Sequence, residues 1–164
     1  MDTPFLIRDA AVIVLHEKDT DSLILTERSS QLRDHPGEIC FPGGIWEEGD
    51  NTLYDTALRE LEEELGINST RVQLHRMLKT EQTLTGYRIS PWLAVIDTLS
   101  PYQMNPVEVA SVIRIPMTEI YKRTNYQQIK VERQGTEILT YQFLVDNYVV
   151  WGATVRIMMQ LSNR

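Results

Sequence analysis

The sequence contains a single cysteine, no long apolar run and no surplus of basic residues. Cys40 is the only cysteine among 164 residues, which excludes an internal disulfide and predicts a reducing compartment. We expect it to pack as a small apolar side chain, because no base that would activate its thiol is evident nearby. No stretch approaches the ~18 apolar residues of a membrane span, and residues 1–4 lack the basic start and apolar run of a signal peptide. We therefore expect a soluble cytoplasmic protein without a membrane partner.

Basic residues are outnumbered in this chain, with 16 Lys and Arg against 23 Asp and Glu and a formal net charge of −7. A nucleic-acid-binding surface normally carries a basic stripe, so this balance argues against a nucleic-acid partner. The same charge would repel an anionic small molecule unless a cation were bound locally. With 42% hydrophobic residues and no repeat, linker or low-complexity segment, residues 1–164 suit one globular domain with a proper core.

The most informative stretch is the acidic segment 53–65. It contains no Gly or Pro, Thr52 and Asp55 at its start form a capping box, and Gly66 follows as the terminating residue. These signals predict a helix of about three and a half turns. At about 100° per residue the helix has an apolar face and an acidic face. The apolar face holds Tyr54, Leu58, Leu61 and Leu65, and the acidic face holds Glu60, Glu63 and Glu64.

The acidic face requires positive charge, because like charges at this spacing oppose helix formation. Arg59, one turn before Glu63, can neutralise part of the charge but cannot serve three acids. A hard divalent cation such as Mg²⁺ fits, because it takes oxygen ligands and completes its shell with waters and substrate phosphates. A merely solvated acidic face is the alternative when the helix is considered alone. The turn Phe41-Pro42-Gly43-Gly44 just upstream permits positive φ and close backbone approach, and this context favours a binding site.

The spacing of these residues resembles the Nudix box of pyrophosphohydrolases, which cut nucleoside diphosphates linked to another group. Residues 59–67 match its Arg-Glu-hydrophobic-x-Glu-Glu-x-Gly-hydrophobic run, downstream of Gly44. The loop between Gly44 and the arginine is one residue longer than in the usual pattern. Where that pattern has a glutamate, this chain has Asp50 after Glu47 and Glu48, so the role of the first acid stays open.

The longer loop is similar to that of the coenzyme A pyrophosphatase branch of Nudix proteins. That branch carries an upstream signature of the form Leu-Thr-x-Arg-Ser-x3-Arg-x3-Gly-x3-Phe-Pro-Gly-Gly, and residues 25–44 fill every fixed position of it. By this resemblance Arg28 and Arg33 bind substrate phosphates, for which planar guanidinium groups are well suited. For each arginine, pairing with a nearby acid such as Glu27 or Asp34 is the alternative.

The order of predicted elements is strands, a helix, more strands and a last helix, which suggests a mixed sheet between helices. The resemblance covers about residues 8–154 and implies the same α+β class, an α/β/α sandwich with the Nudix fold. Pro91 weakens its strand as a central one, so we expect that strand at an edge or with a bulge. The predicted strands are 10–15, 22–26, 38–41, 72–82, 87–96, 109–115, 126–133 and 137–145, and the predicted helices are 53–65, 116–122 and 153–161, the last preceded by 148–152.

The resemblance also implies roles for individual residues. Arg59 holds a glutamate in place, and the backbone of Gly43 and Gly44 lets the substrate come close. Glu108 either contacts the metal, accepts a proton from the attacking water, or caps the neighbouring segment. Tyr87 lines the substrate pocket. The metal ligands implied by the family are Glu60, Glu63 and Glu64, with Mg²⁺ or Mn²⁺ as the cofactor.

Together these features predict a metal-dependent pyrophosphatase that cleaves coenzyme A or a derivative to 3′,5′-ADP and 4′-phosphopantetheine. One alternative is a Nudix hydrolase of another nucleotide, such as ADP-ribose, a dinucleotide or a nucleoside triphosphate, because specificity comes from outside the box. A second alternative is a catalytically silent Nudix domain that binds a nucleotide or a partner protein. The presence of Arg59, Glu60, Glu63 and Glu64 disfavours it. The chain suits either a monomer or a homodimer.

Overall fold

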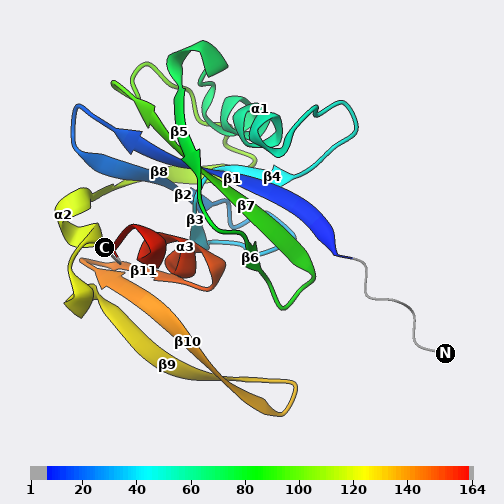
Figure 1. Cartoon of the computed structure of the whole chain (residues 1–164), viewed down its shortest axis with the longest axis vertical. Helices are drawn as coiled ribbons and strands as arrows, with labels where there is room; N and C mark the ends of the chain where they lie inside the picture. Colours follow the sequence, from blue (N-terminus) through cyan, green and yellow to red (C-terminus); the bar gives the residue numbers. More distant parts are fainter. Residues whose placement is uncertain (1–6, 163–164) are drawn as a thin grey trace.

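The computed structural model describes residues 7–162 and shows a mixed sheet with helices on both faces (Figure 1). Five strands follow the order β3-β2-β1-β7-β5, while β4 pairs with β1, β6 with β7 and β8 with β2. The strands of this sheet are β1 (Arg8–Glu17), β2 (Ser22–Arg28), β3 (Ile39–Cys40), β4 (Gly43–Ile45), β5 (Gln73–Met77), β6 (Glu81–Gln82), β7 (Tyr87–Ile96) and β8 (Val109–Pro116).

Strand β1 lies at the centre of the sheet. It pairs antiparallel with β2 and β4 and parallel with β7. Ile13, Val14 and Leu15 are successive residues of β1 and all are fully buried, because both faces of the sheet are covered. The predicted strands 10–15 and 22–26 are confirmed as β1 and β2, and these two strands form a hairpin.

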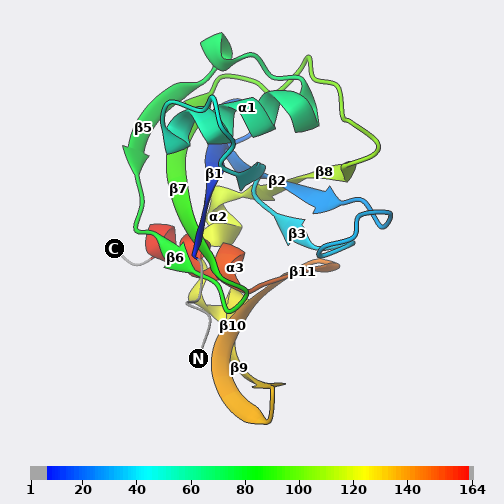
Figure 2. The ribbon, with the colours of Figure 1, turned by 90° about the vertical axis from the view of Figure 1, so that its right-hand side faces the viewer.

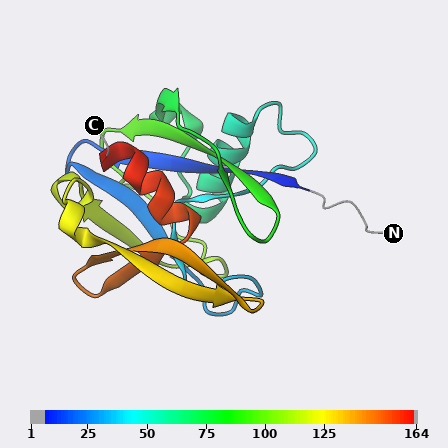
Figure 3. The same ribbon diagram turned by 60° about the horizontal axis from the view of Figure 1, so that its bottom comes forward.

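Helix α1 (Leu53–Leu65) covers one face of the sheet, and α2 (Met117–Ile120) and α3 (Ala153–Ser162) lie on the other (Figures 1 and 3). Separate apolar clusters fill the two interfaces, one containing Leu61 of α1 and the other Met158 of α3. The predicted α/β/α sandwich is confirmed, although the helix expected over 116–122 is a single turn. Within residues 7–162, no helix has the length and apolar character needed to cross a membrane.

The predicted strand 72–82 is wrong as a single element, because the chain is broken between β5 and β6. The break lies opposite Pro91, which has no N–H to donate, and Leu78 N donates to the Pro91 carbonyl there at 2.9 Å. The sequence predicts either an edge position or a bulge for the strand that contains Pro91, and the edge position is wrong. Strand β7 lies between β1 and β5, and the register shift falls on β5 between Leu74 and Arg76.

A second, three-stranded sheet projects away from α1 (Figures 1 and 2). The predicted strands 126–133 and 137–145 are confirmed and pair as a hairpin, whereas residues 148–151, predicted only to precede the last helix, form a third strand. Phe143 is fully buried and its ring lies 4.9 Å from that of Tyr126, so these residues anchor the sheet to the core. The strands are β9 (Tyr126–Arg133), β10 (Thr136–Val145) and β11 (Tyr148–Trp151), and short 3-10 turns η1 (Ser69–Arg71) and η2 (Arg123–Asn125) complete the fold.

Candidate active site

Local sequence signals fix α1 at its predicted boundaries. At its start the Thr52 hydroxyl accepts a hydrogen bond from the backbone N–H of Asp55 at 3.1 Å. At its end Gly66 adopts a φ of 65° and donates to a carbonyl of the last turn. Leu61 and Leu65 are fully buried against the sheet. This packing fixes the rotation of the helix and so places its acidic face.

Strand β4 lies against the acidic face, and its two glycines make this contact possible. The N–H of Gly43 donates to Glu64 Oε2 at 2.9 Å. A Cβ added at Gly44 would lie 2.6 Å from Glu60 Oε1, and one at Gly43 would lie 2.2 Å from the Ala11 carbonyl oxygen. Neither glycine has a positive φ, so these positions require glycine for close approach alone.

Arg59 holds the carboxylates of this region together. Its Nε and Nη2 donate to the two oxygens of Asp50 at 3.0 and 3.1 Å, while its Nη1 donates to Glu60 Oε1 at 3.0 Å and to Glu63 Oε1 at 3.2 Å. Its Nη2 also donates to the Ile45 carbonyl at 3.1 Å, which joins the helix to β4. The guanidinium is thereby fixed between the loop, the helix and the strand.

Asp50, whose role the sequence left open, anchors this arginine. Its carboxylate also accepts hydrogen bonds from the Thr56 hydroxyl at 2.8 Å and from the Glu47 backbone N–H at 3.0 Å. The hydrogen bond from Arg59 is the largest of the interactions that lower the pKa of Asp50 to about 2. The signal in the sequence was an acid in the lengthened loop near the position of the pattern glutamate.

Two of the three acids of the acidic face are shielded from solvent, and the third is exposed. Glu64 is 6% exposed and the Glu60 side chain 14%, whereas the Glu63 side chain is 47% exposed. Burial raises the pKa of Glu64 to about 8, and the nearby charges of Glu60 and Glu108 add to the shift. Burial likewise raises the pKa of Glu60 to about 7, with added contributions from Glu63 and Glu108. Glu108 is therefore close enough to act on both buried acids.

The donor atoms of this cluster are all carboxylate oxygens, which are the ligands that a hard divalent cation prefers. The negative charges of Glu60 and Glu64 are not fully balanced by nearby positive groups, as their raised pKa values indicate. Within the described part of the chain, however, no three acidic, histidine or cysteine side chains form a group ready to hold a metal ion. Arg59 draws Glu60 and Glu63 toward itself, and Gly43 holds Glu64. The three glutamates thus share a region without meeting at one point.

The structure places Arg28 beside the acidic cluster and leaves Arg33 outside it. The Arg28 guanidinium donates to the Asp34 carbonyl at 3.0 and 3.3 Å, so the pairing is with a backbone oxygen rather than with a carboxylate. Its charge also lowers the pKa of Glu64, partly offsetting the effect of burial. Arg33 is exposed and makes no hydrogen bond or ion pair with residues 7–162.

Tyr87 is not brought to the glycines of β4. It pairs with Arg8 at the start of β1, whereas Gly44 pairs with Ala11 farther along the same strand. Cys40 behaves as predicted from its sequence context. Burial raises the pKa of its thiol to about 12, with the charge of Glu64 adding to the shift, so the thiol stays protonated.

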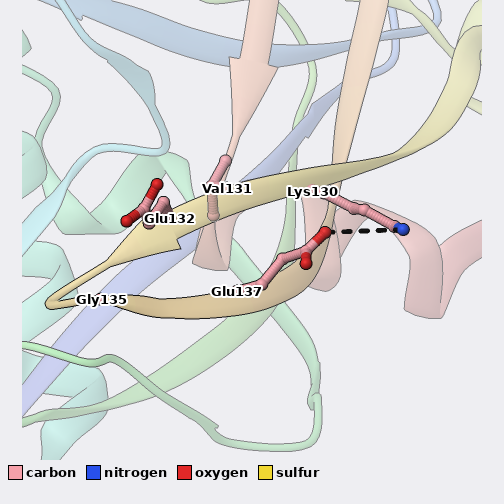
Figure 4. A pocket seen from close by; sticks show the side chains of 5 residues that line it. All are labelled: Lys130, Val131, Glu132, Gly135 and Glu137. Carbon is pink, nitrogen blue, oxygen red and sulfur yellow. Dashed lines mark ion pairs between the residues drawn. The ribbon is translucent and has the colours of Figure 1, made fainter.

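Two hollows of the surface are lined by residues outside the acidic cluster. One adjoins β4 and is lined by residues 7–9 and 45–46. The other lies on the projecting β9–β10 hairpin, where Lys130 Nζ and Glu137 Oε1 form an exposed ion pair at 3.5 Å (Figure 4). The hairpin and α1 occupy opposite ends of the molecule (Figures 1 and 2), so the second hollow does not belong to this site.

Comparison with known proteins shows similarity to a single family. Residues 6–134 match the NUDIX domain family. The chain is 33% identical over 158 residues to the uncharacterized Nudix hydrolase NudL of Photorhabdus laumondii, covering 96% of this chain and 84% of that protein. It is 32% identical over 156 residues to NudL of Enterobacter sp. strain 638, covering 94% and 81%.

Solved structures show the same fold at low sequence identity. A Caenorhabditis elegans Ap4A hydrolase binary complex matches with a TM-score of 0.57 and 20% identity, over 66% of this chain and 80% of that one. The NUDIX domain of Shewanella oneidensis NrtR, complexed with ADP ribose, matches with a TM-score of 0.52 and 19% identity, over 73% and 77%.

Proposed function

The chain belongs to the NUDIX domain family of hydrolases, and on that premise we propose that it cleaves the pyrophosphate bridge of coenzyme A or a derivative to 3′,5′-ADP and 4′-phosphopantetheine. Enzymes of this family hydrolyse phosphoric anhydride bonds and generally use divalent metal ions. The observation that carries the proposal is the buried pair Glu60 and Glu64 against the β4 glycines, with Glu108 close by. In this proposal residues 1–164 act as one domain.

The substrate class is supported by the signature at residues 25–44, which runs from β2 through β3 into β4. This segment ends at the glycines that contact the acidic cluster, and it contributes Arg28 beside Glu64. Arg33 stands exposed on the same loop. Coenzyme A carries three phosphates, and a chain with a net charge of −7 would repel it. The guanidinium groups of Arg28 and Arg33 would offset this repulsion by binding phosphate oxygens.

In the proposed reaction Glu60, Glu63 and Glu64 would hold Mg²⁺ or Mn²⁺. The bound ion supplies neutralisation of the phosphate charges and a lower pKa for the attacking water. Arg59 keeps Glu60 and Glu63 oriented, and the Gly43 N–H orients one oxygen of Glu64.

Glu108 is proposed to accept the proton of the attacking water. The water oxygen then bonds to phosphorus, and the bridging oxygen leaves with the other phosphate. Because Gly44 has no side chain, the Glu60 carboxylate can lie against the backbone of β4.

The test is a substrate panel with purified protein and either Mg²⁺ or Mn²⁺. The panel holds coenzyme A, an acyl-coenzyme A, ADP-ribose, a diadenosine polyphosphate and a nucleoside triphosphate. We expect adenosine 3′,5′-bisphosphate from the coenzyme A substrates, with the highest kcat/KM of the panel. Absence of that product above a metal-free blank would reject the substrate assignment, and turnover of another nucleotide would favour the wider Nudix alternative. Glu62→Gln is the matched control for replacement of Glu64, because Glu62 is an exposed acid on the same helix. The Glu62→Gln variant should turn over the substrates at the rate of the parent protein.

A further inference from the structure

The loop between β7 and β8, residues 97–108, is held by a side chain that has no role in the proposed chemistry. Arg71, at the end of η1, donates to four successive backbone carbonyls of this loop. Its Nη2 lies 2.8, 3.0 and 3.1 Å from the oxygens of Thr98, Leu99 and Ser100, and its Nη1 lies 2.7 Å from that of Pro101. The planar guanidinium can do this because its N–H groups point in several fixed directions.

Glu17 of β1 also binds this part of the loop. The Leu99 N–H donates to Glu17 Oε2 at 2.6 Å, and Leu99 itself is fully buried. Arg114 Nε donates to Glu17 Oε1 at 2.8 Å, so the carboxylate is itself fixed. These bonds satisfy backbone groups that have no strand or helix partner, and they give residues 98–101 one defined position.

Downstream, the loop docks on the carboxyl end of α1. Gln103 N donates to the Leu65 carbonyl at 2.9 Å, and Asn105 N donates to the Glu64 carbonyl at 2.9 Å. The last carbonyls of a helix lack partners within the helix, and here the loop supplies them. The loop is thus positioned relative to the residue that forms the buried part of the acidic cluster.

A tight turn then delivers Glu108 to that cluster. The Asn105 carbonyl accepts hydrogen bonds from Glu108 N at 3.0 Å and Val109 N at 2.8 Å, and the Asn105 side chain accepts one from Val107 N at 3.1 Å. Only two residues therefore lie between Asn105, which is attached to Glu64, and Glu108. The Glu108 carbonyl also accepts a hydrogen bond from Ser29 N at 2.9 Å, so the 97–108 loop holds Glu108 from one side and the segment after β2 holds it from the other.

We propose that Arg71 is a positioning residue of this enzyme, which acts by holding the 97–108 loop, and with it Glu108, against the end of α1 that carries Glu64. The inference rests on the proposed function, because it assigns Arg71 a part in the same reaction. Arg71 does not contact the acidic cluster in the described structure. Its effect on turnover therefore passes through Glu108.

The first test compares Arg71→Ala with Arg76→Ala, using the best substrate of the panel. Arg76 is a suitable control because it is an exposed arginine on the adjacent strand β5, and its side chain makes no hydrogen bond or ion pair within residues 7–162. We expect Arg71→Ala to lower kcat by about tenfold to a hundredfold with little change in KM, since displacing a reacting group by about 1 Å costs up to that much. The kcat of Arg71→Lys should lie between those of the parent protein and Arg71→Ala, because a single ammonium group cannot reach all four carbonyls.

A double-mutant cycle with Glu108→Gln separates positioning from a general loss of structure. In the Glu108→Gln background, Arg71→Ala should lower the residual kcat by less than about twofold. An equal loss in both backgrounds would overturn the inference. If Arg71→Ala does not fold, Arg71→Lys replaces it in the same cycle.

Hydrogen exchange provides a readout that does not depend on activity. Amides of residues 103–109 should exchange faster in Arg71→Ala and remain as in the parent protein in Arg76→Ala. Unchanged exchange in Arg71→Ala would also overturn the inference. If the parent protein is inactive on the whole panel, the proposed function is rejected. If the parent is active and the effects of Arg71→Ala and Glu108→Gln on kcat simply multiply, only the role of Arg71 is rejected.

Discussion

Glu17 and Glu64 are both buried, at 1% and 6% exposure, yet their acidities differ widely. Burial alone would raise the pKa of Glu17, but hydrogen bonds from Arg114, Thr20 and Leu99 N outweigh it and hold the value at about 2. Burial raises the pKa of Glu64 to about 8, since the Gly43 N–H and Arg28 do not offset burial and the neighbouring acids.

The difference separates a structural charge from a functional one. The fold pairs Glu17 with the guanidinium of Arg114. The Glu17 carboxylate thereby links β1, β8 and the 97–108 loop. The acidic cluster at α1 has more negative charge than the protein neutralises, and such unbalanced buried acids are typical of sites that bind a ligand. The following experiments test this contrast, starting with the largest expected effect.

Replacing Glu64 with Gln should lower kcat by about a thousandfold or more, because several kcal/mol of charge stabilisation depend on the ligands of a catalytic metal. Without metal, the same variant should be at least as stable as the parent protein, since it removes a buried, poorly paired charge. Steady-state kinetics with Mg²⁺ and urea unfolding in EDTA measure the two effects. Unchanged turnover would remove Glu64 from the site.

Replacing Glu17 with Gln should give the opposite pattern. The free energy of unfolding should fall by about 3 kcal/mol, at the lower end for a broken buried ion pair because the Arg114 side chain is 33% exposed. Turnover should fall far less than in Glu64→Gln, since a Gln still offers an oxygen to Leu99 N. The control is Asp9→Asn, which breaks the exposed pair between Asp9 and Arg88 and should cost under about 1 kcal/mol.

The two sites should also respond to pH in opposite directions. The pKa of Glu17 is lowered from 4.5 to about 2, so its contribution to stability is complete above pH 4.5 and is lost as the pH falls toward 2. The pKa of Glu64 is raised to about 8, so the metal-free protein should lose stability as the pH rises from 4.5 to 8.

Urea unfolding in EDTA at several pH values measures both slopes. Saturating Mn²⁺ should raise stability at pH 8, by about 2.7 kcal/mol at a hundred times its Kd. A metal-free stability that stays flat between pH 5 and 8, in the parent and in Glu64→Gln alike, would contradict the contrast.

The smallest of these effects is expected at Asp50, which orients Arg59 beside the acidic cluster. Asp50→Asn removes the carboxylate that orients Arg59 and should lower kcat about tenfold to a hundredfold, as is usual for groups that orient metal ligands. Glu48→Gln changes an exposed acid in the same loop and should leave kcat unchanged. Equal kinetics for the two variants would show that Asp50 does not act through Arg59.

The features that the sequence predicted depend on neighbours along the chain. Thr52 caps α1 through a residue three positions away, and Gly66 ends the helix by its own conformation. The acidic face follows from helical periodicity. The residue type of Gly44 predicted positive φ and close approach of a substrate or metal, whereas in the structure Glu60 makes the close approach and φ is not positive.

The features that it did not predict depend on partners that no local pattern connects. Glu17 meets Leu99 and Arg114 across 82 and 97 residues. Strand β11 pairs with β10 where Val150 lies opposite Phe143, and both residues are fully buried. Asp50 was visible as an acid, but only the fold shows that both its oxygens face Arg59.

The β9–β10 hairpin ends in an exposed two-residue turn, where Gln134 and Gly135 have φ values of 53° and 77°. This turn lies at the end of the molecule opposite α1 (Figures 1 and 2). Exposed turns of this kind accept inserted sequence with little loss of stability. A fluorescent label or an affinity handle spliced in at this tip would tether the enzyme to a surface and leave β4 and the acidic helix facing free solution.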